Sequence, residues 1–198
     1  DTRRFNPDRR DAALRAAWGV GERGLACLYV GRLAPEKNLD LACRAFDAIR
    51  SVRPTARMVW VGDGPAAARL QRERPADHFA GTRTGAELAA HYASADLFLF
   101  GSLTETYGNV VAEAMASGLA VAAYRSAAAA ELIADGLSGR SVPPGDEQAF
   151  VAAALGLARD DVLRPAIGRQ ARLDMELRGW PAVVERFEKV LYLATLQS

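Results

Sequence analysis

The sequence predicts an α/β protein with a Rossmann-like, doubly wound parallel sheet. Short apolar runs alternate along the 198-residue chain with segments that have helical periodicity. The first run, residues 25–30, is apolar throughout, which is typical of a parallel strand buried on both faces. Polar and charged residues gather directly after several of these runs, where open parallel sheets bind their ligands. We therefore expect one large domain with a site at the carboxyl ends of its strands.

The expected elements follow one another at short intervals, so right-handed crossovers should connect the parallel strands. Residues 1–18 are interpreted as a linker and a lead-in helix, which the glycine-rich segment 19–24 ends. The expected strands are 25–30, 58–61, 78–80, 96–100, 119–123 and 138–142. The expected helices are 39–52, a helix ending at residue 72, 84–94, a helix closed by Gly118, 127–134, 146–158, 161–177 and 181–196.

Capping residues predict where several helices begin. Asn38 is a suitable N-cap for the helix over 39–52, because its side chain can accept from an unpaired backbone N–H. Thr84 and Glu87 have the spacing of a capping box, in which each side chain bonds to the other residue's backbone. Asp146 is expected to cap the helix that ends near residue 158.

Composition argues against several classes of partner. The net charge of +1 offers no electrostatic attraction to nucleic acid or to an anionic membrane surface, so we expect no nucleic-acid partner. No apolar run approaches the ~20 residues of a membrane span, and no signal peptide is evident. Cys27 and Cys43 stand alone in apolar surroundings, which favours buried, reduced thiols over a disulfide. Since the first residue is Asp1, we expect a fragment of a longer protein.

Two cations lie in the loop after the first expected strand. Arg32 and Lys37 belong to the segment Gly-Arg-Leu-Ala-Pro-Glu-Lys at 31–37, just before a helix N-terminus. An arginine fork and a lysine point charge in that position suit a diphosphate. Alternatively, both are surface cations, with Lys37 paired to a nearby acid. The spacing alone leaves the two interpretations open.

Two carboxylates follow the expected strand 96–100. Glu105 lies in the loop, and Glu113 lies about one turn into the helix that Gly118 closes. Unpaired N–H groups near Gly108, where this helix opens, attract an anion. The carboxylates either form an acid–base pair across one bond or hold the hydroxyl groups of a sugar. In a third interpretation, Glu105 caps its own helix and Glu113 lies on a solvated face.

Other motifs are absent or fit structural roles. The first strand–helix turn lacks Gly-x-Gly-x-x-Gly, and the chain has no P-loop, which argues against dinucleotide-binding and P-loop proteins. No cluster of Cys, His or paired Asp has metal-binding spacing, so we expect no metal site. His78, His91 and the turn at 62–65 are expected to be structural. Glu131, after the expected strand 119–123, fits a site and a surface position equally well.

Four pieces of the sequence, in order, resemble the donor-binding half of GT-B retaining glycosyltransferases of the large mannosyl/glucosyl group 1 type, also called family 4. The resemblance covers about residues 25–145, and two glutamates separated by seven residues are its most specific piece. The sequence departs from the pattern at Gly101, where Pro is usual, at Thr106, where Gly is common, and at residues 127–130, where four Ala replace a Gly-rich turn. The four pieces are Gly31-Arg32-Leu33 with Glu36-Lys37, Gly62-Asp63-Gly64-Pro65, Glu105 and Glu113 with Ala114-Met115-Ala116-x-Gly118, and Glu131 before Asp135-Gly136-x-x-Gly139.

The resemblance implies roles for individual residues. Arg32 and Lys37 would bind the diphosphate of a UDP- or GDP-sugar, and Glu105 would contact the transferred sugar; these three are the implied catalytic residues. Glu113 would hold the ribose hydroxyls, and the base would lie near residues 81–82. The implied substrate-binding residues are Arg32, Lys37, Gly81, Thr82, Glu105, Thr106, Tyr107, Gly108, Asn109, Val110 and Glu113.

The resemblance also implies a reaction and a wider protein. The sugar would be transferred with retention of its anomeric configuration, without a metal or other cofactor. A glycan or lipid acceptor would bind a separate N-terminal domain. Residues 19–178 would then be the donor-binding domain, residues 179–198 a helix crossing toward the missing domain, and the fragment alone would be inactive.

Further expectations concern the organism, the location in the cell and the alternative functions of this protein. The resemblance indicates a bacterial enzyme of glycan biosynthesis in the cytoplasm, either free or held peripherally at the inner face of the membrane. Two rival functions share the fold and the diphosphate chemistry. One is a nucleotide-sugar epimerase of the same fold, and the other is a nucleotide-binding module without catalysis.

Overall fold

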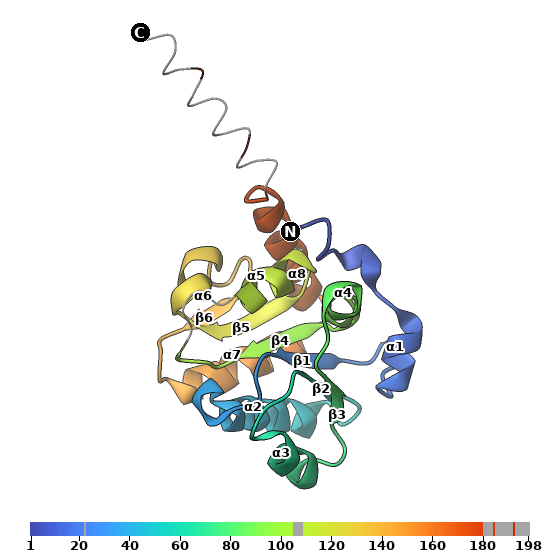
Figure 1. The fold of residues 1–198 in the computed structure, drawn as a ribbon. Helices are drawn as coiled ribbons and strands as arrows, with labels where there is room; N and C mark the ends of the chain where they lie inside the picture. Colours follow the sequence, from blue (N-terminus) through green and yellow to red (C-terminus); the bar gives the residue numbers. More distant parts are fainter. Residues whose placement is uncertain (22, 105–108, 180–183, 185–191, 193–198) are drawn as a thin grey trace.

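The computed structural model describes the chain except for residues 22, 105–108, 180–183, 185–191 and 193–198. Six parallel strands form one sheet in the order β3-β2-β1-β4-β5-β6, which confirms the doubly wound α/β class (Figure 1). From β1 the strand order runs outward in both directions, to β2 and β3 on one side and to β4, β5 and β6 on the other. The loops that follow β1 and β4 therefore leave the carboxyl edge of the sheet in opposite directions. The strands are β1 Ala26–Val30, β2 Arg57–Val61, β3 His78–Gly81, β4 Leu97–Phe100, β5 Ala120–Tyr124 and β6 Arg140–Val142.

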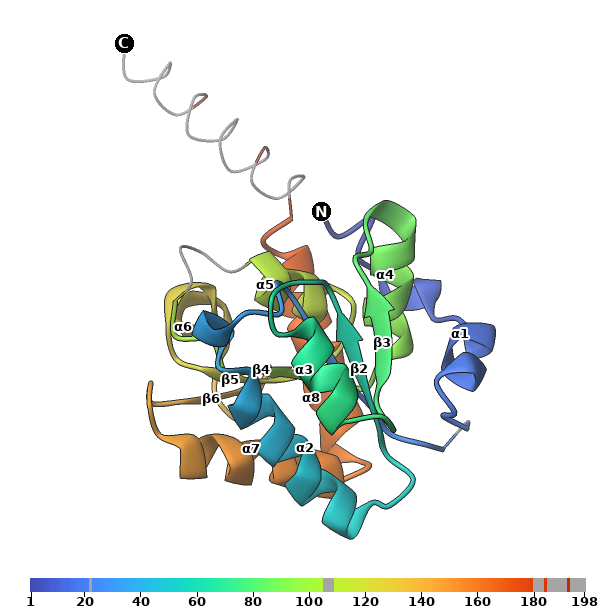
Figure 2. The same ribbon diagram turned by 60° about the horizontal axis from the view of Figure 1, so that its bottom comes forward.

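Helices cover both faces of the sheet. On one face α2 and α7 pack against each other over β4, and on the other face α8 packs against α5 and β5 (Figures 1 and 2). The helices are α1 Ala12–Ala17, α2 Leu39–Val52, α3 Ala67–Glu73, α4 Gly85–Ser94, α5 Asn109–Ala116, α6 Ala127–Leu132, α7 Glu147–Arg159 and α8 Leu163–Glu176, with 3₁₀ turns η1 Pro7–Arg9 and η2 Pro35–Lys37.

The core lies between these layers. Every residue of β1, β4 and β5 is buried, as the continuous apolar runs predict for strands covered on both faces. Cys27, in β1, is a free buried thiol whose pKa burial raises far above its usual value. Cys43, in α2, is also free and half-buried, and burial raises its pKa to about 11. The expectation of a buried thiol outside a disulfide is confirmed for Cys27, and Cys43 is less buried than expected.

Two of the three expected helix caps are wrong in detail. Asn38 occupies the N-cap position of α2 but has φ 52°, and its side chain makes no capping bond. Thr84 precedes α4 and makes no capping bond. The first residue of the helix, Gly85, has a left-handed backbone with φ 55°, which a capping box does not allow. Asp146 does cap α7, because its carboxylate accepts from the backbone N–H of Ala149 at 2.9 Å.

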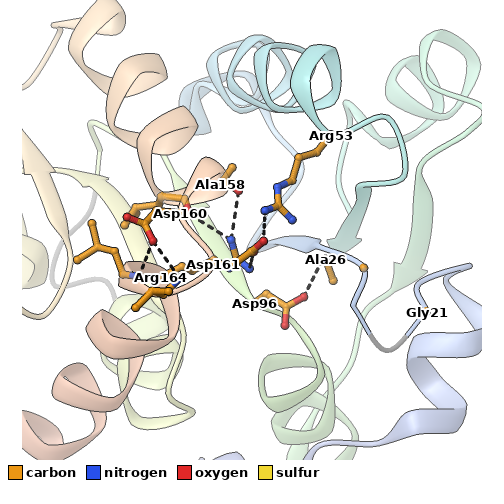
Figure 3. A network of polar contacts seen from close by, with 12 residues as sticks. Gly21, Ala26, Arg53, Asp96, Ala158, Asp160, Asp161 and Arg164 are labelled. Carbon is orange, nitrogen blue, oxygen red and sulfur yellow. Dashed lines mark hydrogen bonds and ion pairs between the residues drawn. The ribbon is translucent and has the colours of Figure 1, made fainter.

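The lead-in segment packs against the sheet. Phe5 and Trp18 are buried in the core, and the buried Arg15 donates to the Asp96 carboxylate at 2.9 Å. The same carboxylate accepts from the backbone N–H of Ala26, the first residue of β1, at 2.8 Å (Figure 3). Residues 1–18 therefore contribute to the core.

Structural polar contacts gather at the amino ends of the strands. Arg53, at the end of α2, forms an ion pair with Asp161, which also pairs with Arg164 at 2.6 Å (Figure 3). The Asp160 carboxylate accepts from the backbone N–H of Val162 at 2.9 Å and from that of Leu163, the first residue of α8, at 2.8 Å. These bonds hold the α7–α8 turn against α2. The expected last helix, 181–196, lies mostly outside the described residues.

Candidate functional site

A cavity of about 560 Å³ lies at the carboxyl ends of β1 and β4, where the strand order reverses. This is the position at which open α/β sheets bind ligands. The cavity brings together the loop after β1, the loop after β4 and the first turn of α5. It is lined by Tyr29, Val30, Gly31, Arg32, Glu36, Lys37, Phe100, Thr104 and Val110.

The two predicted cations both line this cavity. Arg32 has a side chain that is 65% exposed, and its Nη1 lies 3.5 Å from Oε1 of Glu36. Lys37 ends η2, and its Nζ lies 3.5 Å from the carbonyl oxygen of Thr104. The long contact between the exposed Arg32 and Glu36 is weak, so it leaves the Arg32 guanidinium able to bind an anion.

The turn at residues 62–64 supports the Arg32 loop through its backbone. The backbone N–H of Gly31 donates to Val61 at 3.0 Å, and that of Leu33 donates to Asp63 at 2.9 Å. A Cβ on Gly62 would lie 2.0 Å from the Gly31 carbonyl oxygen, and one on Gly64 would lie 2.5 Å from that of Leu33. Glycine is therefore required at both positions, and the interpretation of this turn as structural agrees with its geometry.

Long-range side-chain bonds join the loops after β1 and β4. The Thr104 hydroxyl donates to the Glu36 carbonyl at 3.0 Å, and the Asn38 amide donates to the Gly101 carbonyl at 3.2 Å. Sequence reasoning assigned neither Thr104 nor Asn38 to the site. The partners are more than 60 residues apart, so no local pattern could have revealed them.

The structure describes only part of the predicted carboxylate loop. Glu105, Thr106, Tyr107 and Gly108 lie outside the described residues. Asn109 opens α5 and is exposed, and Val110 lines the cavity beside the cations.

Glu113 lies in the second turn of α5 and is half-buried, so its helix face is not fully solvated. Burial raises the pKa of its carboxyl group, and the nearby Tyr92 hydroxyl partly opposes the rise. The Tyr92 hydroxyl is buried and makes no hydrogen bond of ordinary length to any described residue. A carboxylate with part of its hydration removed is suited to accept hydrogen bonds from ligand hydroxyls.

The remaining predicted residues lie outside the lining of this cavity. Gly81 ends β3 at φ 68° and is followed by the exposed Thr82, two strands away from β1. Glu131, on α6, is exposed, and its carboxylate lies 3.7 Å from Nη1 of Arg178. The described residues contain no group of three or more acidic, His or Cys side chains able to hold a metal ion. Nor does any helix in the described part of the chain have the length and apolar character to cross a bilayer.

A second cavity of about 560 Å³ lies at the opposite, amino edge of the sheet, between η1 and α8. Four arginines line it, but Arg10, Arg164 and Arg172 already donate to backbone carbonyls and carboxylates. None of the predicted site residues lines this cavity. The cavity at the carboxyl edge is therefore the better candidate site.

Comparison with known proteins identifies the family. A family model described as "Glycosyl transferases group 1" matches residues 24–160. The sulfoquinovosyl transferase SQD2 of Arabidopsis thaliana is 34% identical over 203 residues, which cover 99% of this chain and 39% of that protein. A GDP-mannose-dependent alpha-mannosyltransferase of Mycobacterium tuberculosis is 36% identical over 187 residues, which cover 93% of this chain and 47% of that protein. The chain thus spans less than half the length of these two relatives.

Solved structures are similar in fold. Anabaena Alr3699/HepE, crystallised with UDP and glucose, has a TM-score of 0.75 at 22% identity over 95% of this chain and 55% of its own. The C-terminal domain of the group 1 protein LpcC from Francisella tularensis has a TM-score of 0.75 at 24% identity, with 89% of this chain and 96% of that domain covered. At this level of identity, these two likenesses concern the fold alone. By its family match and its close relatives, the chain belongs to the group 1 glycosyltransferases and has the Rossmann-like fold of a GT-B domain.

Proposed function

We propose that this chain is the donor-binding domain of a glycosyltransferase that moves a sugar from a nucleoside diphosphate to an acceptor with retention of configuration. The observation that carries the proposal is the cavity at the strand-order reversal, where Arg32, Lys37 and the first turn of α5 meet. A relative named for GDP-mannose and a similar structure solved with UDP and glucose support a nucleotide-sugar donor. They leave a UDP- and a GDP-linked sugar as the two donors to test.

Each residue has a proposed task. Arg32 and Lys37 bind the two phosphates, and the backbone N–H groups at the start of α5 add donors near Asn109 and Val110. Glu113 accepts from the ribose hydroxyls. Glu105, outside the described residues, contacts the sugar. The base lies toward residues 81–82.

The proposed chemistry depends on stabilising the leaving group. Negative charge accumulates on the nucleoside diphosphate as the bond to the sugar breaks. Two cations and a helix N-terminus aimed at that charge lower the energy of the transition state. We propose that they do this without a metal, so that transfer continues when a chelator removes divalent ions.

The whole protein extends beyond this chain in the proposal. A separate N-terminal domain binds the acceptor, a glycan or a lipid, and residues 179–198 cross toward it. The isolated chain then binds the donor without transferring its sugar. We place the enzyme in the cytoplasm, with the inner membrane face as a peripheral location when the acceptor is a lipid.

Calorimetric titration of the chain with UDP, GDP and their sugars tests the proposal. Arg32→Ala should weaken the binding of nucleoside diphosphate by at least about tenfold, because a charge-assisted bond contributes roughly 1.5–3 kcal/mol. Arg169→Ala, an exposed substitution on α8 at the far edge of the sheet, is the matched control and should leave binding unchanged. Equal affinities for the Arg32→Ala variant and the unchanged chain would refute the diphosphate role.

The same titration separates the two carboxylates. Glu113→Ala should weaken the binding of both free nucleotide and sugar-bearing donor, since the ribose is common to both. Glu105→Ala should spare the free nucleoside diphosphate and weaken only the donor that carries a sugar. If Glu105→Ala weakened both equally, the assignment of Glu105 to the sugar would be wrong.

A further inference from the structure

We propose that Tyr29 is a positioning residue for Arg32, and that its hydroxyl holds the loop after β1 in the conformation that binds a diphosphate. The inference rests on the proposed function, because the diphosphate site is part of it. In the sequence, Tyr29 belongs to the apolar run 25–30 and to no motif.

The Tyr29 ring is held rigidly inside the sheet. Tyr29 is fully buried in β1, and its ring lies 5.3 Å from that of Trp60 on β2 and 6.2 Å from that of Phe100 on β4. Aromatic neighbours on both adjacent strands leave the ring few rotamers. The position of its hydroxyl is therefore set by the core and not by the loop.

The Tyr29 hydroxyl bonds to the loop at Arg32, the proposed diphosphate ligand. It donates to the carbonyl oxygen of Arg32 at 3.2 Å, and Tyr29 also lines the candidate cavity. Gly31 lies between the two residues at φ 149°, and a Cβ on it would lie 3.1 Å from the Tyr29 hydroxyl. The loop thus turns closely over the tyrosine, and the positive φ and the tight contact both favour glycine at this position.

The other side of the loop is held by the 62–64 turn. There the backbone N–H of Gly31 bonds to Val61, and Gly62 lies so close to the Gly31 carbonyl that a Cβ would meet its oxygen at 2.0 Å. Tyr29 and this turn together fix the backbone on both sides of Arg32. The Arg32 side chain is largely exposed, and its contact with Glu36 is 3.5 Å long. The position of the Arg32 backbone therefore determines from which point the side chain reaches toward a ligand.

A preformed loop binds more tightly than a mobile one. A guanidinium that binds two phosphate oxygens must present its N–H groups in a fixed direction. If the loop were free, ordering it would oppose binding. Removing the Tyr29 hydroxyl should therefore lower affinity although Arg32 keeps its guanidinium.

The test is Tyr29→Phe in titrations of this chain with UDP and GDP. We expect the dissociation constant to rise about two- to tenfold, as for the loss of one hydrogen bond. Tyr124→Phe is the matched control, because Tyr124 is also a buried strand tyrosine and its hydroxyl bonds to no described residue. Its dissociation constants should equal those of the unchanged chain.

A double-mutant cycle distinguishes positioning from direct contact. If Tyr29 acts through Arg32, then Tyr29→Phe should have no further effect in the Arg32→Ala background. Additive effects of the two substitutions would overturn the inference. So would an unchanged affinity of Tyr29→Phe alone, even where the unchanged chain binds nucleoside diphosphate well. Absence of any binding by the unchanged chain would instead refute the proposed function, and this inference with it.

Discussion

Ala127, the first residue of α6, has φ 45°, in the left-handed region that costs most residues energy. It is the first of four consecutive alanines, at 127–130. The backbone therefore adopts a conformation suited to glycine although the side chain is alanine. This local strain lies in the segment that follows β5 at the carboxyl edge of the sheet, on the same edge as the candidate site.

Ala127→Gly should raise the free energy of unfolding by roughly 0.5–1 kcal/mol, because relief of the left-handed strain exceeds the greater flexibility of glycine in the unfolded chain. Ala130→Gly is the control, because Ala130 lies on the same helix and has no positive φ. It should lower the free energy of unfolding by about 0.5–1 kcal/mol. Urea denaturation measures both changes. A destabilised Ala127→Gly variant would show that the alanine at this position is not strained.

At the scale of elements, α1 depends on one buried side chain. Arg15 donates to the Asp96 carboxylate at 2.9 Å, to the Ser94 carbonyl at 2.7 Å and to the Gly24 carbonyl at 2.8 Å. One guanidinium therefore joins α1 to the end of α4, to the start of β4 and to the segment before β1. The short helix has few residues of its own with which to pack, since it spans only Ala12–Ala17.

Arg15→Met should lower the free energy of unfolding by about 3 kcal/mol, because it removes one partner of a buried ion pair and leaves carbonyls without donors. Arg9→Met, in the exposed part of η1, should change it by less than about 0.5 kcal/mol. Both values come from urea denaturation followed by circular dichroism. A small effect of Arg15→Met would mean that the other contacts of the lead-in segment, among them the buried Phe5 and the Arg10–Asp96 ion pair, hold it without Arg15.

At the scale of the whole molecule, two histidines link stability to pH. His78 and His91 both have pKa values below the usual range, chiefly because burial disfavours the charged ring, and Arg83 lowers both further. At these two residues, the unfolded chain therefore binds more protons than the folded chain. Stability is fully present above the unfolded pKa of about 6.5 and declines as the pH falls through it.

The melting temperature should fall between pH 7.5 and pH 5.5, and the fall should be smaller in a variant carrying His78→Gln and His91→Gln. The comparison between the two proteins is necessary because Glu113 acts in the opposite direction. Burial raises the pKa of Glu113, so the folded state binds that proton more readily and gains relative stability at low pH. Parallel pH profiles for the two proteins would exclude the histidines as the cause.

The fold and the cation pair followed from sequence because they depend on local signals. The apolar runs of β1, β4 and β5 are continuous, and such runs are typical of parallel strands that are buried on both faces. Arg32 and Lys37 are five residues apart in one loop, so placing the loop places both. The Asn38 and Thr84 caps were wrong because the backbone is left-handed at Asn38 and Gly85. Asn and Gly permit this conformation, but the surrounding loops decide whether it is adopted.

Tertiary structure alone decided what supports those cations. Tyr29 meets Arg32 across a glycine, Thr104 meets Glu36, and Asn38 meets Gly101, and the last two pairs join loops that are distant in sequence. The sequence by itself determined the order of elements, the family and the residues that carry charge at the carboxyl edge. It could not determine these supporting contacts, because a hydrogen bond depends on distances of a few tenths of an ångström that only the packed sheet establishes.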